Sequence, residues 1–179
     1  MSITASLNGY KHVCRRNVGG VSLIGFVPIQ NIKAVEAEGS LVDSITFNED
    51  AKKFVEYQSQ LDQAEFKISA SEVSIQLRFN ALSSESSEAY NELLEASACG
   101  LAALVQMNNG AVAFLGWTNE FKGRRPIMSV EPEGSSGKAP TDDNYLDITL
   151  KTSQVTAPLY LSKELAESID TLFEPATAA

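Results

Sequence analysis

The dipeptide Asn109-Gly110, set between two apolar runs, constrains the fold of this chain more than any other feature of its sequence. A two-residue primed turn needs positive φ at both central residues, and Asn and Gly tolerate that conformation best. We therefore expect residues 101–107 and 111–117 to pair as antiparallel strands around this turn.

The segment before the hairpin, residues 85–99, has the periodicity of a helix. The residues that would share one helical face are Ala89, Tyr90, Leu93, Leu94, Ser97 and Ala98. Serines at its start suit an N-cap, Glu85 suits the first turn, and Gly100 stands where a left-handed residue ends a helix. A central helix that leads into a hairpin is the predicted middle of the fold.

The remaining chain predicts mainly strands. β-Branched runs or two-residue alternation mark residues 21–29, 32–37, 41–47, 54–61, 66–79, 127–130 and 145–152. Pro28 places the first of these near a sheet edge, and a change of parity at Ser71-Glu72 predicts a bulge or bend. Residues 131–144 are expected to be a long loop, and Ser162 to cap a last helix over residues 163–173.

These elements predict an α+β fold that is mainly β, with antiparallel sheets in a sandwich or barrel packed against one central helix. A short C-terminal helix completes it. The 179 residues are expected to form an N-terminal arm at 1–18, one β-rich domain at 19–162, and a C-terminal helix and tail at 163–179.

Charge and composition exclude several functions. With 23 acidic and 14 basic residues the formal net charge is −9, which disfavours tight binding to nucleic acid because that affinity comes from Lys and Arg. The sequence shows no long apolar run and no secretory signal, so we expect a soluble protein made in a cytoplasm. Cys14, Cys99 and a single His12 suggest neither a zinc site nor a disulfide framework, and Cys99 is expected to be a buried free thiol.

No set of side chains predicts catalysis, a cofactor or a metal. The Gly-rich residues 133–138 resemble a phosphate loop, but that loop needs a Ser or Thr and then a helix after its Gly-Lys, and here Ala139-Pro140 and then a strand follow. Asp142, Asp143 and Asp147 lack the spacing of a calcium loop, so turn formation is favoured for them. Nothing around His12 supports a catalytic triad. We expect no catalytic, cofactor-binding or metal-binding residue.

One part of the sequence resembles a known group of proteins. The order is a helix, a strand, an Asn-Asn-Gly turn, a strand ending in Leu115-Gly116, the segment Ser-Ser-Gly-Lys-Ala-Pro-Thr-Asp-Asp-Asn-Tyr at 135–145, an alternating strand and Ala157-Pro158-Leu-Tyr. From about Phe66 to Ser162 this is similar to virion structural proteins of tailed phages and prophages of Bacteroidetes-type hosts. The resemblance implies a protein that assembles and carries no catalytic residues. Tail-tube subunits and their relatives pack a β-sheet layer against a helix and close into six-membered rings whose sheets line a channel.

Three classes of function stay open. The first is a tail-tube or tail-neck ring subunit that self-assembles into a conduit for DNA, and the second is another virion component such as a connector, decoration or baseplate protein. In both, the partners would be further copies of the chain and other virion proteins, with DNA passing only transiently and no membrane involved. The protein would lie in the virion after assembly in the host cytoplasm. An enzyme or a small-molecule binding module has the least support from the residues.

Two groups of residues are candidates for these roles. Loop residues expected at subunit contacts are Gly134, Ser135, Gly137, Lys138, Asp142 and Asp143. Outward polar positions expected to face a lumen are Glu56, Glu65, Glu72, Gln76 and Asp147, with Lys67, Arg78 and Lys151 paired to carboxylates or turned to an interface. A neutral or negative wall would let DNA slide, whereas Lys and Arg would hold its phosphates. A solvated outer surface explains the same charge equally well.

Overall fold

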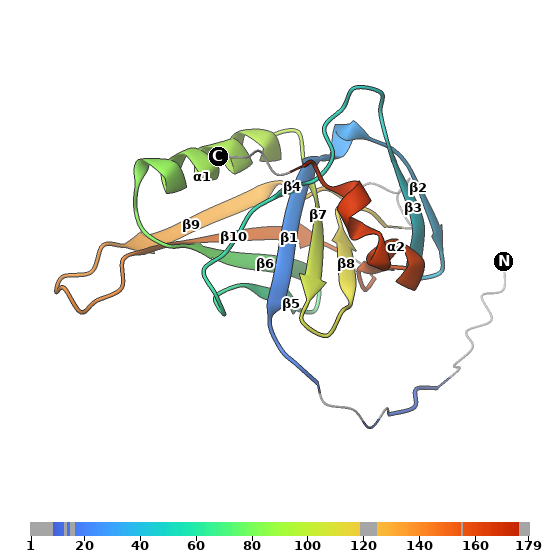
Figure 1. Cartoon of the computed structure of the whole chain (residues 1–179), viewed down its shortest axis with the longest axis horizontal. Coiled ribbons are helices and arrows are strands. Elements are labelled where there is room, and N and C mark those ends of the chain that lie inside the picture. Colours follow the sequence, from blue (N-terminus) through green and yellow to red (C-terminus); the bar gives the residue numbers. More distant parts are fainter. Residues whose placement is uncertain (1–8, 13, 15–16, 119–124, 155, 176–179) are drawn as a thin grey trace.

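Two sheets share one apolar core in the computed structural model, which describes residues 9–12, 14, 17–118, 125–154 and 156–175 (Figure 1). The larger sheet has the strand order β2-β3-β11-β8-β7-β1-β4 and the smaller β5-β6-β10-β9. Every pair is antiparallel except β11 with β3. The fold is therefore mainly β with antiparallel pairing, as the sequence predicts.

The elements have the following bounds. The strands are β1 Val21–Pro28, β2 Ile32–Glu38, β3 Leu41–Phe47, β4 Val55–Glu56, β5 Glu65–Ile68, β6 Glu72–Phe79, β7 Leu101–Met107, β8 Val112–Leu115, β9 Ser129–Ser135, β10 Tyr145–Ser153 and β11 Leu159–Leu161. The helices are α1 Ser84–Ser97 and α2 Lys163–Glu167, with 3-10 turns at Ile29–Asn31 and Ile169–Leu172. The predicted arm at 1–18 lies largely outside the described residues, as do residues 119–124 and the end of the tail.

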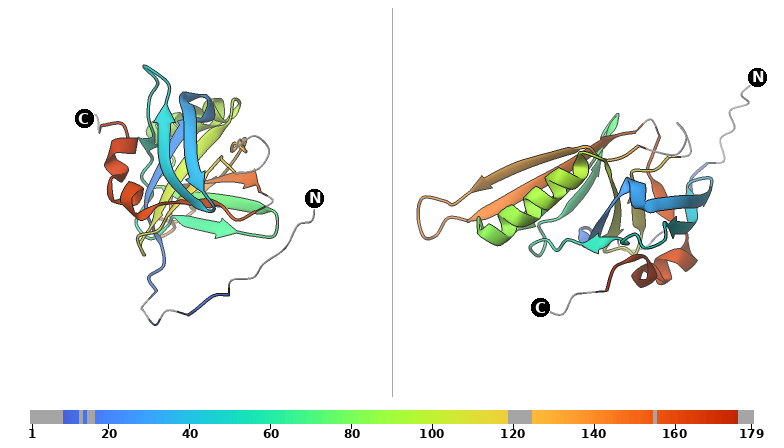
Figure 2. Two further views of the ribbon diagram at one scale, coloured as in Figure 1. Left: turned by 90° about the vertical axis from the view of Figure 1, so that its right-hand side faces the viewer. Right: turned by 90° about the horizontal axis from the view of Figure 1, so that it is seen from above.

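Alternation along the strands of the smaller sheet places the core between the two sheets. Val73, Ile75 and Leu77 of β6 are buried, whereas the residues between them are partly exposed. The same cluster contains Leu93 of α1 and one face of the larger sheet. Figure 2 shows α1 lying along the β9–β10 hairpin, at one end of the molecule.

The other face of the larger sheet is buried as well. Ala102, Leu104 and Phe114 point into a second cluster that the C-terminal segment covers with Ile169 and Leu172. The C-terminal segment is tied to the chain before β4. There the Phe54 N–H donates to the Leu172 carbonyl at 3.1 Å, and the Glu174 N–H donates to the Phe54 carbonyl at 2.8 Å. Strands β7 and β8 therefore run through the centre of the protein, which explains why residues 101–105 and 112–115 are all apolar.

The hairpin β7–β8 has the predicted strands but a different turn. Ala103 pairs with Leu115 and Gln106 with Val112, so the loop spans residues 108–110. Gly110 has φ of +91°, whereas Asn109 keeps a negative φ. The two-residue primed turn is therefore wrong: this is a three-residue loop with the left-handed position at glycine, and the Asn109 side chain accepts from the Ala111 N–H at 3.0 Å.

Helix α1 begins and ends close to the predicted residues. The Ser86 N–H donates to Ser83 Oγ at 3.2 Å and the Ser83 N–H donates to Ser86 Oγ at 3.0 Å, which forms a capping box. Gly100 follows the helix with φ of +94°. The prediction of a buried Cys99 is wrong, because the residue follows the last turn and is exposed to solvent.

Three strand predictions need correction. The parity change at Ser71-Glu72 is the turn of a hairpin, β5–β6, in which Phe66 pairs with Ile75. The segment 131–144 contains strand β9, so only residues 136–144 form the loop. In the segment 54–61 only Val55 and Glu56 form a strand, since the chain then leaves the sheet.

Candidate functional site

The outward face of the smaller sheet is polar on all four of its strands. We call this the polar face, and strand register defines its members. They are Glu65 and Lys67 on β5, Glu72, Ser74, Gln76 and Arg78 on β6, Tyr145, Asp147, Thr149, Lys151 and Ser153 on β10, and Ser129, Glu131, Glu133 and Ser135 on β9. Five of these side chains are acidic and three are basic, so the face has an excess of two negative charges. Within the described chain, no other element pairs with or lies over it (Figures 1 and 2).

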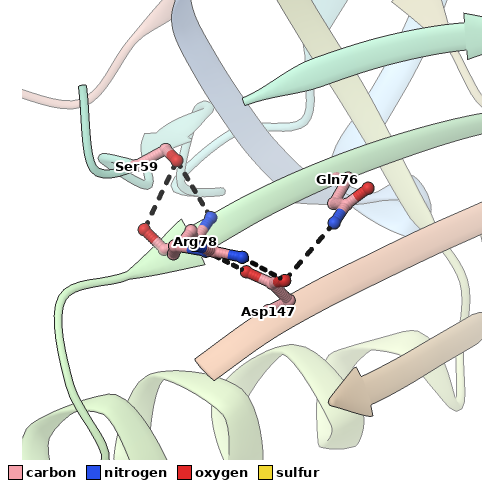
Figure 3. A network of polar contacts seen from close by, with 4 residues as sticks. All are labelled: Ser59, Gln76, Arg78 and Asp147. Carbon is pink, nitrogen blue, oxygen red and sulfur yellow. Dashed lines mark hydrogen bonds and ion pairs between the residues drawn. The ribbon is translucent and has the colours of Figure 1, made fainter. Parts of the chain in front are cut away.

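A network at the centre of the polar face joins β6 to β10 (Figure 3). The Arg78 guanidinium donates from Nε to Asp147 Oδ1 at 2.6 Å and from Nη2 to Oδ2 at 2.9 Å. Gln76 reaches the same carboxylate at 3.5 Å, and the guanidinium lies over the Tyr145 ring at 4.2 Å. The hydrogen bond to Asp147 raises the pKa of Arg78 above its ordinary value. The arginine is therefore held in the sheet and is not free for a phosphate.

A second ion pair ties β10 to β9. Lys151 Nζ lies 3.1 Å from Glu131 Oε2, and this hydrogen bond raises the pKa of Lys151, with Glu72 adding to the effect. The expectation that Arg78 and Lys151 pair with carboxylates is confirmed. Lys67 forms no ion pair within the described chain, so it is the free cation among the predicted three.

The predicted lumen-facing residues lie partly together. Glu65 and Gln76 are opposite each other in β5 and β6, and Glu72 lies on the same face. Asp147 belongs to this face too, but at 7% exposure it is buried under its ion pair, so it is no free carboxylate. Glu56 is exposed on β4 of the other sheet, away from this group.

Glu131 and Glu133 are members of the polar face that the sequence did not indicate. Pro132 and Gly134 around them favoured a loop, but Pro is tolerated on an edge strand, which β9 is. The signal that was missed is pairing with β10, in which Pro132 stands opposite Ile148 and Glu133 opposite Asp147.

The predicted contact loop is ordered by its own hydrogen bonds. Asp142 Oδ2 accepts from the Lys138 N–H at 2.8 Å and the Ala139 N–H at 2.9 Å, and these bonds lower the pKa of Asp142. This confirms the prediction that Asp142 bonds its own backbone in a turn. Gly137, Lys138, Asp142 and Asp143 are in the loop, whereas Gly134 and Ser135 belong to β9. The view from above in Figure 2 shows this loop at the far end of the β9–β10 hairpin, beyond α1.

Both edges of the smaller sheet are open in the described structure. Strand β5 forms one edge and β9 the other, and neither has a further strand beside it. Unpaired edges are templates for strands of another chain. Ile68 at the end of β5 is 50% exposed and Met128 just before β9 is 61% exposed, so each edge also has an exposed apolar side chain.

A groove of about 360 Å³ lies between β1 and residues 57–64. Its Tyr57 is half-buried and donates to Glu92 Oε2 at 3.0 Å. Burial first, and Glu92 second, raise the pKa of Tyr57, so the phenol stays protonated and fastens this segment to α1. Among the described residues, no group of three or more His, Cys, Asp or Glu is placed to hold a metal ion.

Comparison with known proteins adds no relative. No family model, no curated protein and no solved structure matches this chain. In the part of the chain that the structure describes, no helix is both long and apolar enough to cross a membrane.

Proposed function

We propose that this chain is a self-assembling structural subunit of a phage particle, most similar in role to a tail-tube or tail-neck ring protein. The polar face would line a channel that DNA crosses, and the partners would be further copies of the chain and other virion proteins. The observation that carries the proposal is a single sheet that is uncovered on its polar face and unpaired along both edges.

The edges supply the contacts that such an assembly needs. If β5 of one copy pairs with β9 of the next, the smaller sheet continues from copy to copy and its polar face becomes one surface. Repetition of this head-to-tail contact closes a ring when the rotation between copies allows it. The exposed Ile68 and Met128 would be buried at these contacts.

The charge of the polar face suits passage of DNA. Its acidic excess repels phosphates weakly, and two of its three cations are already paired with carboxylates. DNA would therefore cross without being held. The β9–β10 hairpin, which projects beyond α1, supports a contact with a neighbouring ring or with another virion protein such as a connector or baseplate component.

The test is assembly of the purified full chain. Light scattering after size exclusion and negative-stain imaging should show rings with a central hole, and stacking of the rings would favour a tube over a neck ring or connector. Ile68→Lys should abolish ring formation without unfolding the chain, because a lysine at an edge opposes strand pairing. The matched control is Leu41→Lys, which is equally exposed at 49% but lies on the larger sheet. A chain that stays monomeric at high concentration, or rings unaffected by Ile68→Lys, would contradict the proposal.

A further inference from the structure

The basic and acidic residues of this chain are segregated along the sequence. The arm before Gly19 carries Lys11, Arg15 and Arg16, and the first acidic residue of the chain is Glu36. In contrast, no basic residue occurs between Arg78 and Lys122, the stretch that contains α1. One segment is thus purely cationic, and one helix is purely anionic.

The outer face of α1 has no cationic partner within the described chain, and the side-chain hydrogen bond it makes there is the one that Glu92 accepts from the Tyr57 hydroxyl. Glu85, Glu88, Glu92 and Glu95 are all exposed, and none forms an ion pair with a basic residue in the described chain. Glu92 and Glu95 lie toward the C-terminal end of the helix, where the helix dipole disfavours carboxylates, and the last turn contains no basic residue. Leu94, between them, is 44% exposed. A cationic segment with some apolar character would pair with these carboxylates, offset their unfavourable interaction with the helix dipole and cover Leu94.

The N-terminal arm has that character. Tyr10 is 91% exposed and Lys11 is exposed beside it. The described arm residues lie away from both sheets, at the opposite end of the molecule from α1 (Figures 1 and 2). We infer that the basic arm of one copy binds the outer face of α1 on a second copy. The inference rests on the self-association proposed above, but uses a different surface from the sheet edges.

Other acidic surfaces fit the arm less well because they contain cations of their own. The polar face includes Lys67, Arg78 and Lys151. The acidic C-terminal segment begins with Lys163 and is contacted by Lys53, whose Nζ donates to the Thr171 carbonyl at 2.9 Å. Of these three surfaces, helix α1 is the one without a basic residue, so its charge complements that of the arm best.

The two cysteines of the chain provide a direct test. Cys14 precedes Arg15 in the arm, Cys99 follows α1 one turn after Glu95, and both thiols are exposed. If the arginines reach Glu95 of a second copy, the two different thiols come close together. Mild oxidation of the full chain with oxidised glutathione should then give Cys14–Cys99 disulfides between copies, identified by peptide mass spectrometry on mixed isotope-labelled and unlabelled protein. Statistical mixing of the three possible cysteine pairs, or Cys14–Cys99 links confined to one copy, would overturn the inference.

A charge exchange tests the same contact without oxidation. The probe is a fluorescent peptide of residues 1–18 with Cys14→Ser, titrated with the full chain in a fluorescence anisotropy assay. Glu88→Lys with Glu95→Lys should weaken binding about tenfold, and a peptide with Arg15→Glu and Arg16→Glu should recover it on that variant. The control variant Glu133→Lys, on the polar face, should bind the unaltered peptide as well as the wild type does.

The peptide assay does not require rings, so it separates the two proposals. Saturable, salt-sensitive binding that follows the charge exchange supports the arm contact even where no ring forms. Binding that ignores the α1 reversal, or no binding at low salt, overturns it whether or not the sheet edges assemble.

Discussion

The central strands of the two sheets bury their side chains in opposite ways. In β7 of the larger sheet, five consecutive residues from Leu101 to Val105 are buried, because both faces of that strand are covered. In β6 of the smaller sheet, buried and partly exposed residues alternate, because only one face is covered. The larger sheet therefore contributes apolar burial from both faces, whereas the smaller sheet leaves one face exposed to solvent and available for contacts.

Charge follows the same division. Strands β7 and β8 of the larger sheet contain no charged side chain, whereas the polar face of the smaller sheet holds eight, four of them in two ion pairs. Leaving one face of a sheet polar reduces the apolar area that it buries and hence its share of the stability. Substitutions on the two sheets should accordingly differ in how much they lower the free energy of unfolding.

The largest effect is expected where a strand is covered on both faces. Phe114 of β8 is fully buried, and Phe114→Ala should lower the free energy of unfolding by about 3–5 kcal/mol through lost burial and a cavity. Thr149→Ala on the polar face should change it by less than about 0.5 kcal/mol. Urea unfolding of both variants checks this, and equal losses would mean that the comparison between the sheets is wrong.

The next effect is expected at the ion pair of the smaller sheet. Asp147→Ala leaves the Arg78 guanidinium unpaired at 20% side-chain exposure. We expect a loss of about 2–3 kcal/mol, less than for a fully buried pair because Arg78 keeps some access to water. Arg78→Gln combined with Asp147→Asn should cost less than the sum of the single variants in a double-mutant cycle. Strict additivity would show that the two side chains do not act as a unit.

A smaller effect is expected from strain in the turn of the larger sheet. Gly110 has φ of +91° and open space around the position of a Cβ, so Gly110→Val adds a backbone cost and no clash. We expect a loss of about 1–2 kcal/mol in thermal or urea unfolding. Gly110→Asn should cost less, since Asn tolerates positive φ better. Unchanged stability in the valine variant would indicate a different register for the hairpin.

The sequence was informative wherever local pattern and tertiary context agree. The central helix was predicted from its capping serines, strand β7 from its apolar run and strand β10 from its alternation, because each of these signals indicates a single type of element at that position. The same alternation correctly grouped Glu65, Glu72, Gln76 and Asp147 on one face. The alternation was ambiguous at Ser71-Glu72, because a bulge and a hairpin turn produce the same change of parity and the structure has the hairpin turn.

The rest of the candidate site depends on strand pairing, which periodicity does not specify. Glu56 joined the other sheet because β4 pairs with β1. Asp147 became buried because its register places it opposite Arg78. Strand β9 was missed since Pro132 and Gly134 are poor strand formers on their own, and only an edge position beside β10 makes them acceptable.

The smallest effect is expected at the tip of the smaller sheet, where Asp142 holds the loop of residues 136–144. Its pKa is lowered because the Ala139 and Lys138 N–H groups donate to the carboxylate. A lowered pKa in the folded state means that these bonds are fully present above the unfolded pKa of about 3.9 and are lost as the pH falls through the lower folded value. The amide proton signals of Lys138 and Ala139 should shift together over that acidic range, while the global free energy of unfolding changes only slightly because water screens the exposed carboxylate. Asp142→Asn should remove the transition and Asp143→Asn, its matched control, should keep it; a transition that survives Asp142→Asn would assign the loop's order to another group.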